Sequence, residues 1–409
     1  MTGAAAGSIA IVVHASVPAD PRIRRQADAL VGAGYEVDIF ALRDPGQSSE
    51  EQSGALRVLR LPVRRRFVGF AGHLAEYVAF AGQAAVRLTA EHRRRRYRLV
   101  QVATLPDFLV FAAGPLKLAG VPLLLDLHED MPAFFEDRFA SLPGGLLRPI
   151  VRAVVRGSSA MADELLTVHE PLRALAVARG TDPEKITVVM NGADERLFDP
   201  GRYPRREFME DGELRLVHHS ALQRIYGLEV AIDAIARLSP ARGDPTVRLD
   251  VYGDGPYRPQ IEAAIERTGT GAQVRLHGPV PLDQLPGLLA QADLGLVPSL
   301  PESYLQLSLS TKLLEYVAMG VPVIASDLAT FRAHFDGAAL TYVPGGDPDA
   351  LAEAIRRTST DPRAAGLQAA AAQRQGKPYG WSRQAPAYLA VVERLIRSAP
   401  QESADAPPE

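Results

Sequence analysis

The chain has 409 residues, of which 47% are hydrophobic and 23% charged, and its formal net charge is −3. This length predicts two domains, and this composition is typical of a folded globular protein. The charge gives no overall attraction to nucleic acid, and the absence of cysteine excludes disulfides, thiolate nucleophiles and cysteine-bound zinc. Because the first residues lack a basic segment before an apolar run, and no window offers about 20 uninterrupted apolar residues, we expect a cytoplasmic protein without a membrane span.

Short β-branched or leucine-rich runs alternate with longer stretches of helical period along the whole chain, which predicts an α/β protein with parallel sheets. In the first half we expect strands at 9–13, 36–42, 56–61, 99–102, 123–126, 164–168 and 186–190, and helices at 23–33, 71–91, 107–119, 145–157 and 170–179. In the second half we expect strands at 215–219, 248–252, 274–277, 294–298, 323–325 and 340–342. The pattern predicts two Rossmann-like domains, whose ligands bind beyond the carboxyl ends of the strands.

A stretch rich in proline, arginine and aspartate, 194–213, has little apolar periodicity and predicts a domain boundary near residue 200. We therefore expect an N-terminal domain over 1–199 and a C-terminal domain over 200–380. A helix over 381–397 is expected to pack back on the N-terminal domain, followed by a disordered tail over 398–409.

The segment 298–327 is the most informative part of the sequence, since it reads as a strand, a serine-rich loop and the start of a helix. The helix is expected to begin at Ser310 and Thr311, where free N–H groups and the helix dipole favour a phosphate. Lys312 adds a positive charge in the first turn, which is unfavourable there unless an anion lies nearby, and Glu315 follows one turn later. The alternative interpretation is a capped surface helix that carries Lys and Glu.

The run from Leu-Glu-Tyr to Val-Ile-Ala-Ser-Asp at 314–327 resembles a motif of the family 4 glycosyltransferases. Three further segments resemble motifs of that family in the expected order, at 187–200, 249–256 and 274–281. The resemblance implies the GT-B fold, with two Rossmann-like domains facing each other across a cleft, and transfer of a sugar from a nucleotide-sugar donor with retention at the anomeric carbon. UDP-sugar is the default donor and GDP-sugar the alternative, and neither a cofactor nor a metal is expected.

The same resemblance assigns the donor to the C-terminal domain. It implies that Glu315 binds the ribose hydroxyls, a task that suits a carboxylate. The donor-binding candidates are Glu315, Ser310, Thr311, Gly278, Val280, Gly253 and His219.

Two expected features of the family are missing from the donor segment. The second glutamate of the family would stand at Leu307, so Glu302 becomes the candidate for the sugar. Neither basic residue of the family's diphosphate site stands in its usual place within 218–227, so Arg224 is the candidate together with Lys312. A solvated helix-start role for Arg224, and a structural role for the histidine at 219, stay open.

In the N-terminal half, the sequence Asp-Leu-His-Glu after a predicted strand resembles the family's Asp-x-His-Glu, which makes His128 and Glu129 catalytic candidates. A neutral imidazole can contact the sugar or take the acceptor's proton, and the alternative is that His128 holds its loop by hydrogen bonds. Relatives often carry a histidine after the preceding strand, where this chain offers Asp107. Asp20, a predicted helix cap, and Arg22, in the first helical turn, are further candidates for the acceptor or a phosphate.

Two basic runs, 64–66 and 93–98, flank a long and mostly apolar helical stretch. Weak peripheral contact with the inner face of an anionic membrane is one interpretation, and a buried helix with solvated ends is the preferred one. Nucleic acid is not expected as a partner, because no stacking pattern accompanies the charge.

The sequence leaves two rival functions open. One is a catalytically lapsed nucleotide-sugar binding protein, suggested by the missing glutamate and basic residues, and the other is a different GT-B activity such as a phosphorylase or an epimerase. The acceptor, whether a small natural product, a lipid or a glycan, and the oligomeric state are not specified by the sequence.

Overall fold

The computed structural model describes residues 6–17, 20–63, 69–138, 144–239, 243–302 and 305–399. The chain divides into two compact units, the first formed by Met1–Met190 with Gln384–Glu409 and the second by Asn191–Arg383. The boundary expected near residue 200 therefore falls inside the second unit, next to the 3-10 turn Pro200–Arg202. The reason is that Ala193 and Phe198 are buried, and apolar anchors in an otherwise polar segment tie it to the second unit.

The first unit contains an eight-stranded sheet in the order β3-β4-β2-β1-β5-β6-β7-β8. Its strands are β1 (Ser8–Ser16), β2 (Glu36–Leu42), β3 (Glu50–Ser53), β4 (Leu56–Leu61), β5 (Tyr97–Ala103), β6 (Leu123–Leu127), β7 (Glu164–Thr167) and β8 (Ile186–Val188). Every strand expected from the sequence is present and pairs in parallel. The unpredicted β3 pairs antiparallel with β4, and its Glu-Glu-Gln-Ser sequence is fully exposed and carries no apolar signal.

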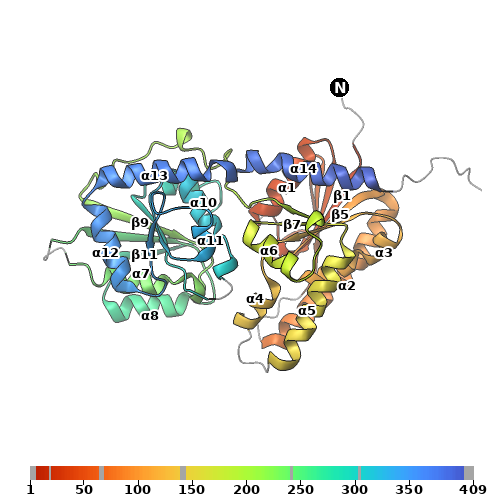
Figure 1. Cartoon of the computed structure of the whole chain (residues 1–409), viewed down its shortest axis with the longest axis horizontal. Helices are drawn as coiled ribbons and strands as arrows, with labels where there is room; N and C mark the ends of the chain where they lie inside the picture. Colours follow the sequence, from red (N-terminus) through yellow and green to blue (C-terminus); the bar gives the residue numbers. More distant parts are fainter. Residues whose placement is uncertain are drawn as a thin grey trace, which may run out of the picture. The chain divides into compact units, whose positions relative to one another are not determined.

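Helices of the first unit are α1 (Pro21–Gly32), α2 (Gly69–Arg95), η1 (Asp107–Ala113), α3 (Gly114–Leu118), α4 (Met131–Arg138), α5 (Gly144–Met161), α6 (Glu170–Ala178), η2 (Pro183–Lys185) and α14 (Trp381–Ser398). The single helix expected over 107–119 is a 3-10 helix followed by a short α-helix, because Pro115 stands at the start of α3 and cannot donate a backbone hydrogen bond. The short α4 was not expected. Figure 1 shows α14 running beside the sheet of this unit, and α4 packed with α5.

The second unit contains a six-stranded parallel sheet in the order β11-β10-β9-β12-β13-β14. Its strands are β9 (Glu213–His219), β10 (Thr246–Tyr252), β11 (Val274–Gly278), β12 (Leu294–Val297), β13 (Val323–Ser326) and β14 (Thr341–Val343). Its helices are η3 (Pro200–Arg202), η4 (Arg224–Tyr226), α7 (Leu228–Ile235), α8 (Arg258–Thr268), α9 (Leu285–Ala290), η6 (Leu305–Leu307), α10 (Thr311–Ala318), α11 (Ala329–Arg332), α12 (Pro348–Ser359), α13 (Pro362–Gly376) and η7 (Lys377–Tyr379). Helix α7 packs against both α8 and α12 (Figure 1).

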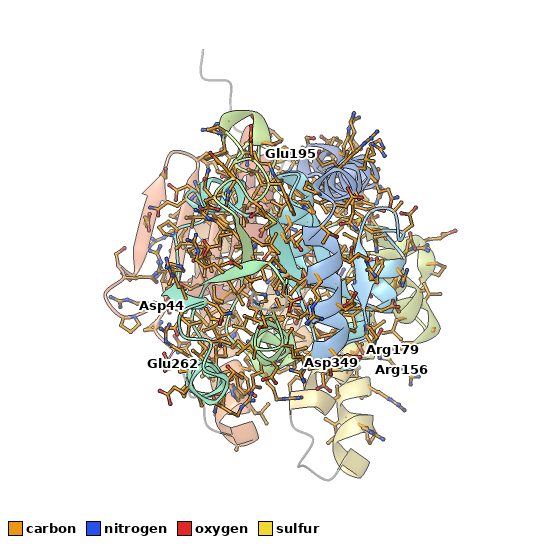
Figure 2. All side chains as sticks on the ribbon, turned by 90° about the vertical axis from the view of Figure 1, so that its left-hand side faces the viewer. Asp44, Arg156, Arg179, Glu195, Glu262 and Asp349 are labelled. Carbon is orange, nitrogen blue, oxygen red and sulfur yellow. The ribbon has the colours of Figure 1, made fainter. Side chains whose placement is uncertain are left out.

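Charged side chains cover the outer helices of the second unit, as Glu262 on α8 and Asp349 on α12 illustrate (Figure 2). The interior is apolar: a continuous core of Leu, Ile, Val and Ala side chains joins β9, β10 and β12 to α7 and α12. The first unit has an equivalent core around β1, β5 and β6.

Both sheets reverse their strand order beside their first strand, between β1 and β5 in the first unit and between β9 and β12 in the second. In open parallel sheets, ligands bind at the carboxyl ends of the strands at such a reversal. We call the residues that follow the strands at this end the carboxyl edge of each unit, and the predicted site residues lie on these two edges.

No helix within the described residues is long and apolar enough to cross a bilayer. Of the two basic runs, 64–66 lies outside the described residues. In the other run, Arg95 forms ion pairs with Glu36 and Asp38, and Arg98 donates to the carbonyl of Ala6. The predicted tail lies outside the described residues from position 400 onward.

Candidate functional site

A buried lysine occupies the first turn of α10, on the carboxyl edge of the second unit. Ser310 precedes the helix as its N-cap and makes no side-chain capping bond, and Thr311 is the first helical residue. Lys312 is 5% exposed, and its Nζ lies 4.0 Å from the centre of the Tyr226 ring. Burial lowers the pKa of Lys312 to about 7, although the charge of Glu315 acts in the opposite direction. The first turn of α10 therefore holds a cation that only an added anion would fully stabilise.

Glu315 lies one turn further along α10 and faces the end of β9. Its Oε2 is 3.2 Å from Nε2 of His219, whose ring packs edge-on against Tyr316 with 5.2 Å between the ring centres. Burial, with added repulsion from Lys312, lowers the pKa of His219 to about 3. The imidazole is therefore neutral at pH 7, and Glu315 keeps carboxylate lone pairs with which it can accept hydrogen bonds from ligand hydroxyls.

The loops of this edge pack backbone against backbone, which explains two of its glycines. Gly227 has a φ of +66°, and a Cβ there would lie 1.9 Å from the carbonyl oxygen of Pro298. Gly253 has a φ of +143°, and its amide donates to the carbonyl of Gly278 at 2.7 Å. The structure thus brings the predicted Gly253 and Gly278 together, with Val280 half-buried just beyond them.

Arg224 and Glu302, predicted separately for the diphosphate and the sugar, bind each other. Their Nη2 and Oε1 atoms are 2.6 Å apart, and the arginine side chain is 56% exposed. This pairing could not be predicted from sequence, because the two residues are 78 positions apart. Leu307, at the position of the missing glutamate, ends the 3-10 turn η6.

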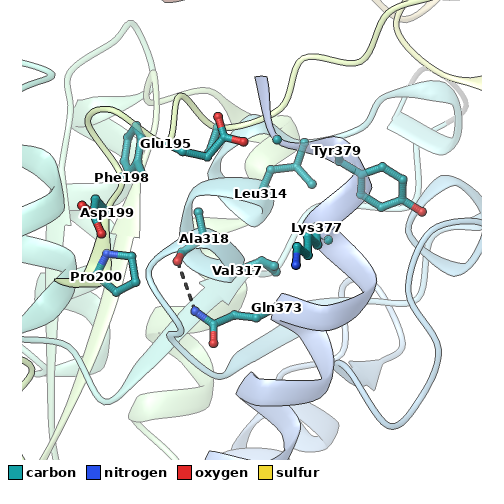
Figure 3. Close-up of a pocket in the computed structure, with 13 residues that line it drawn as sticks. Glu195, Phe198, Asp199, Pro200, Leu314, Val317, Ala318, Gln373, Lys377 and Tyr379 are labelled. Atoms are coloured by element: carbon teal, nitrogen blue, oxygen red, sulfur yellow. Dashed lines mark hydrogen bonds between the residues drawn. The ribbon is translucent and has the colours of Figure 1, made fainter. Parts of the chain in front are cut away.

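A cavity of about 240 Å³ also lies in the second unit, against the other side of α10 (Figure 3). Leu314, Val317 and Ala318 line it, whereas Lys312 and Glu315 point elsewhere, because about 3.6 residues complete one helical turn. The remaining lining residues are Ala193, Glu195, Phe198, Asp199, Pro200, Gln373, Gly376, Lys377, Tyr379 and Gly380. None of the predicted donor-binding residues lines this cavity.

On the carboxyl edge of the first unit, Asp20 and Arg22 form a closed pair at the start of α1. Asp20 caps the helix by accepting from the backbone N of Arg22 at 3.0 Å, and it also accepts from the Arg22 Nη2 at 2.8 Å. Burial would raise the pKa of Asp20, but Arg22 holds it at about 2. The guanidinium expected to meet an acceptor or phosphate is therefore already bound to a carboxylate.

His128 follows β6 and is buried, with 4% of its surface exposed. Its Nε2 lies 3.2 Å from Oδ2 of Asp126, and its backbone N donates to Oγ1 of Thr104 at 3.1 Å. Glu129 is half-buried, and it joins Asp20 in raising the pKa of Arg22 against the effect of burial. The structure therefore gathers the predicted His128, Glu129, Asp20 and Arg22 at one edge.

Asp107 begins η1 and is 2% exposed. Its Oδ1 accepts no hydrogen bond from the residues that the structure describes. Burial, together with the negative charge of Asp130, raises the pKa of Asp107 to about 7, while Arg179 opposes the rise. Asp130 itself accepts from the Arg179 Nη2 at 3.0 Å. Asp107 is therefore a neutral acid below pH 7 and a buried carboxylate above it.

Sequence reasoning missed several residues at these edges. His14, in β1, lies 3.3 Å from a carboxylate oxygen of Glu76 on α2, and both side chains are buried. The sequence signal for this pair was Glu76, a charged residue inside a helix that is otherwise mostly apolar. Tyr226, beneath Lys312, gave no signal, whereas Gln101 interrupts the otherwise apolar strand β5. Only the fold shows which side chains these residues contact.

Comparison with known proteins decides the family. Residues 19–192 match the family described as Glycosyl transferase 4-like domain, and residues 213–361 match Glycosyl transferases group 1. A D-inositol 3-phosphate glycosyltransferase of Catenulispora acidiphila is 30% identical over 296 residues, 68% of each chain. The chain belongs to the family 4 glycosyltransferases. A second member of this transferase family, a 2-deoxystreptamine glucosyltransferase of Streptomyces kanamyceticus, is 27% identical over 74% of this chain and 79% of the relative.

Solved structures confirm the GT-B fold of this glycosyltransferase. Sucrose-phosphate synthase from Thermosynechococcus elongatus superposes with a TM-score of 0.77 at 18% identity, covering 96% of this chain and 100% of the other. The Anabaena protein HepE in complex with UDP-glucose has a TM-score of 0.67 at 16% identity, covering 95% and 99%. At these identities the similarity shows the fold alone, while the family shows that the enzyme is a transferase, as the sequence predicted.

Proposed function

We propose that this glycosyltransferase takes its sugar from a nucleotide-sugar bound at the carboxyl edge of the second unit, and that the sugar is transferred with retention. The observation that carries the proposal is the buried Lys312 in the first turn of α10, whose pKa burial lowers to about 7. A lysine in this place loses hydration and opposes the helix dipole, so an anionic ligand is what would stabilise its charge. UDP-sugar is the first donor to test, because HepE was solved with UDP-glucose on the same fold.

The chemistry follows from where charge develops. As the bond between the anomeric carbon and the diphosphate breaks, negative charge grows on the leaving phosphate oxygens. The free N–H groups at Ser310 and Thr311, the helix dipole and the Lys312 ammonium stabilise that charge. Contact with the diphosphate raises the pKa of Lys312 again, so the lysine is protonated in the complex.

Glu315 supplies the specificity for the ribose in this proposal. Its carboxylate can accept hydrogen bonds from the two ribose hydroxyls, and the neutral ring of His219 lies 3.2 Å from it. Gly278 leaves room for the nucleotide to approach the backbone, since a Cβ there would meet nothing within 4 Å.

The acceptor belongs to the first unit in this proposal. His128, paired with Asp126, contacts the sugar or receives the acceptor's proton, and Asp107 is a further polar group on the same edge. The two relatives are named for D-inositol 3-phosphate and 2-deoxystreptamine, which are both polyhydroxylated six-membered carbocycles. Cyclitols are therefore the first acceptors to screen, ahead of lipids and glycans.

Calorimetric titration with UDP, GDP, ADP and dTDP, on the intact protein and on Glu315→Ala, tests the donor half. We expect one nucleotide to bind and the variant to weaken it by about 100-fold, the effect of two charge-assisted hydrogen bonds at about 1.5 kcal/mol each. Glu262→Ala, on the exposed face of α8, is the matched control and should bind as the parent does. Binding of none of the four nucleotides would contradict the proposal.

The rival functions give different products with the same reagents. A lapsed enzyme would bind the nucleotide-sugar but would not transfer the sugar to any acceptor. A phosphorylase would require inorganic phosphate, and an epimerase would isomerise the donor in the absence of an acceptor. Release of nucleotide that depends on an added cyclitol would support the transferase.

A further inference from the structure

A chain of buried hydrogen bonds runs from the C-terminal helix α14 to Asp126, beside His128, inside the first unit. The Tyr388 hydroxyl donates to Oε1 of Gln101 at 2.6 Å, and Nε2 of Gln101 donates to Oε1 of Gln26 at 2.8 Å. Both glutamines donate to Oδ2 of Asp126, at 2.7 Å from Gln26 and 3.2 Å from Gln101. That same oxygen lies 3.2 Å from Nε2 of His128. All five side chains are buried.

The donor and the acceptor of each hydrogen bond in this network follow from the groups at its two ends. An ionised aspartate only accepts hydrogen bonds, so each glutamine must turn its amide nitrogen toward Asp126. The Gln101 oxygen is then left for a donor, and the Tyr388 hydroxyl fills this need. Burial raises the pKa of Tyr388 well above its usual value, with the charge of Asp126 adding to the effect, so the hydroxyl keeps its proton.

Asp126 stays ionised at the centre of the network. Burial alone would raise its pKa, but His128, the hydrogen bond from Gln26 and the charge of Arg22 together lower it. A carboxylate that accepts from two glutamine amides has a defined position. The ring of His128, whose Nε2 lies 3.2 Å from this carboxylate, therefore faces a negative charge in a fixed place.

The amide side chain of Gln101 departs from its apolar neighbours in the strand. Gln101 stands in the parallel strand β5, where neighbours such as Leu99, Val100 and Val102 are fully buried hydrophobic residues. A buried polar network is costly unless every member is satisfied, so a role other than packing is indicated.

We propose that Tyr388 and Gln101 are positioning residues, through which α14 holds the Asp126–His128 pair in the orientation that the acceptor half of the site uses. In this proposal helix α14 orients a group that takes part in the reaction, in addition to packing on the first unit. This proposal rests on the proposed function only for the role of His128 in transfer, since the orientation of the ring can be measured without any substrate.

The test compares Tyr388→Phe with the parent by NMR of the intact protein labelled with ¹⁵N at histidine, with His128 assigned through His128→Gln. We expect Tyr388→Phe to shift the ring-nitrogen signals of His128 and to change their pH dependence. Once an acceptor is known, kcat should fall about tenfold with KM for the donor unchanged, and the pH profile of kcat should move with the NMR signals.

Tyr97→Phe is the matched control, because Tyr97 is also buried in the first unit and donates to an aspartate, Asp38, at 2.6 Å, outside the network. Unchanged His128 signals in Tyr388→Phe, or equal changes in Tyr97→Phe, would overturn the proposal. If Tyr388→Phe does not fold, Gln101→Met removes the acceptor of the Tyr388 hydroxyl and gives the same readout. Failure of nucleotide binding alone would overturn the proposed function and leave the NMR result valid.

Discussion

Each unit holds a buried ionisable side chain that forms no ion pair among the described residues of its carboxyl edge, and the two carry opposite charge when ionised. Lys312 in the second unit and Asp107 in the first are both at most 5% exposed. Burial brings the pKa of both to about 7, downward for the lysine and upward for the aspartate. At neutral pH each group therefore lies near the midpoint between its charged and neutral forms.

The surroundings of the two groups differ, and the difference separates their roles. Lys312 lies in the first turn of α10 over the Tyr226 ring, so helix dipole and lysine together favour an anion. Asp107 lies near a second carboxylate, Asp130, which disfavours its ionised form. An anion beside Lys312 would therefore stabilise the edge of the second unit, whereas Asp107, when protonated, can donate a hydrogen bond at the edge of the first.

The largest expected effect is on stability, from Asp107→Asn. The pKa of Asp107 rises from 3.8 to about 7 on folding, so the native state binds the proton more tightly than the unfolded state. Its contribution to stability is present below pH 3.8 and is lost as the pH rises to 7, a change of about 4 kcal/mol. Asparagine removes this loss, and the variant should be more stable than the parent at pH 8 by up to that amount.

Thermal unfolding of parent and variant from pH 4 to pH 8 measures the effect as a gap in Tm that closes toward pH 4. Asp349→Asn, whose side chain is 80% exposed, is the control and should follow the parent at every pH. A gap that does not change with pH would show that Asp107 is ionised throughout, and would remove one side of the comparison.

The next effect is on donor binding, from Lys312. A nucleotide-sugar has no phosphate that titrates near neutrality, so its affinity reports the lysine. Because the free protein holds Lys312 with a pKa of about 7, affinity should be constant below that pH and fall above it, by at most about tenfold per pH unit. Lys312→Met should bind about 100-fold more weakly at pH 6 and lose this pH dependence.

The stability of the ligand-free protein depends on pH in the opposite direction to the donor affinity, and this provides a second check. The folded pKa of Lys312 lies below the unfolded value of 10.5, so its contribution to stability is present above pH 10.5 and is lost as the pH falls toward 7. Lys312→Met should therefore raise the Tm of the free protein most at pH 6 to 7. A variant that is destabilised at pH 6 would show that the lysine is satisfied without a ligand.

Much of the architecture was predictable from sequence because the strands are apolar runs bounded by turn residues. The buried strands β2 and β4 begin and end where the apolar pattern predicts. Strand β3 was missed because it is an exposed edge strand that exists through its pairing with β4 and not through burial. The boundary near residue 200 was misplaced because two buried residues, Ala193 and Phe198, outweigh the polar composition around them.

Candidates for the site could be named from sequence where a local signal exists. Lys312 is anomalous in a helical first turn, and the motif around Glu315 marks the segment, so both could be named from sequence. The partners that fix their chemistry could not, because contacts such as His219 with Glu315 join residues far apart in the chain. The same holds for Tyr388, which contacts Gln101 across 287 positions.

The smallest expected effect concerns the exposed pair of Arg224 and Glu302, and it tests whether burial is what distinguishes Lys312. A surface ion pair contributes at most about 1 kcal/mol, so Arg224→Ala and Glu302→Ala should each change the free energy of unfolding by less than that.

The same two variants also test the binding of the donor. If Arg224 turns to the diphosphate, Arg224→Ala weakens the affinity for a nucleotide-sugar by a few-fold, and Glu302→Ala strengthens that affinity by releasing the guanidinium. If Glu302 binds the sugar, its alanine variant weakens the nucleotide-sugar while leaving the affinity for the free nucleotide unchanged. If Arg224→Ala lost as much affinity for the nucleotide-sugar as Lys312→Met does, an exposed cation would bind the donor as strongly as a buried one. Burial would then not distinguish Lys312, and the two edges would differ only in the sign of their charge.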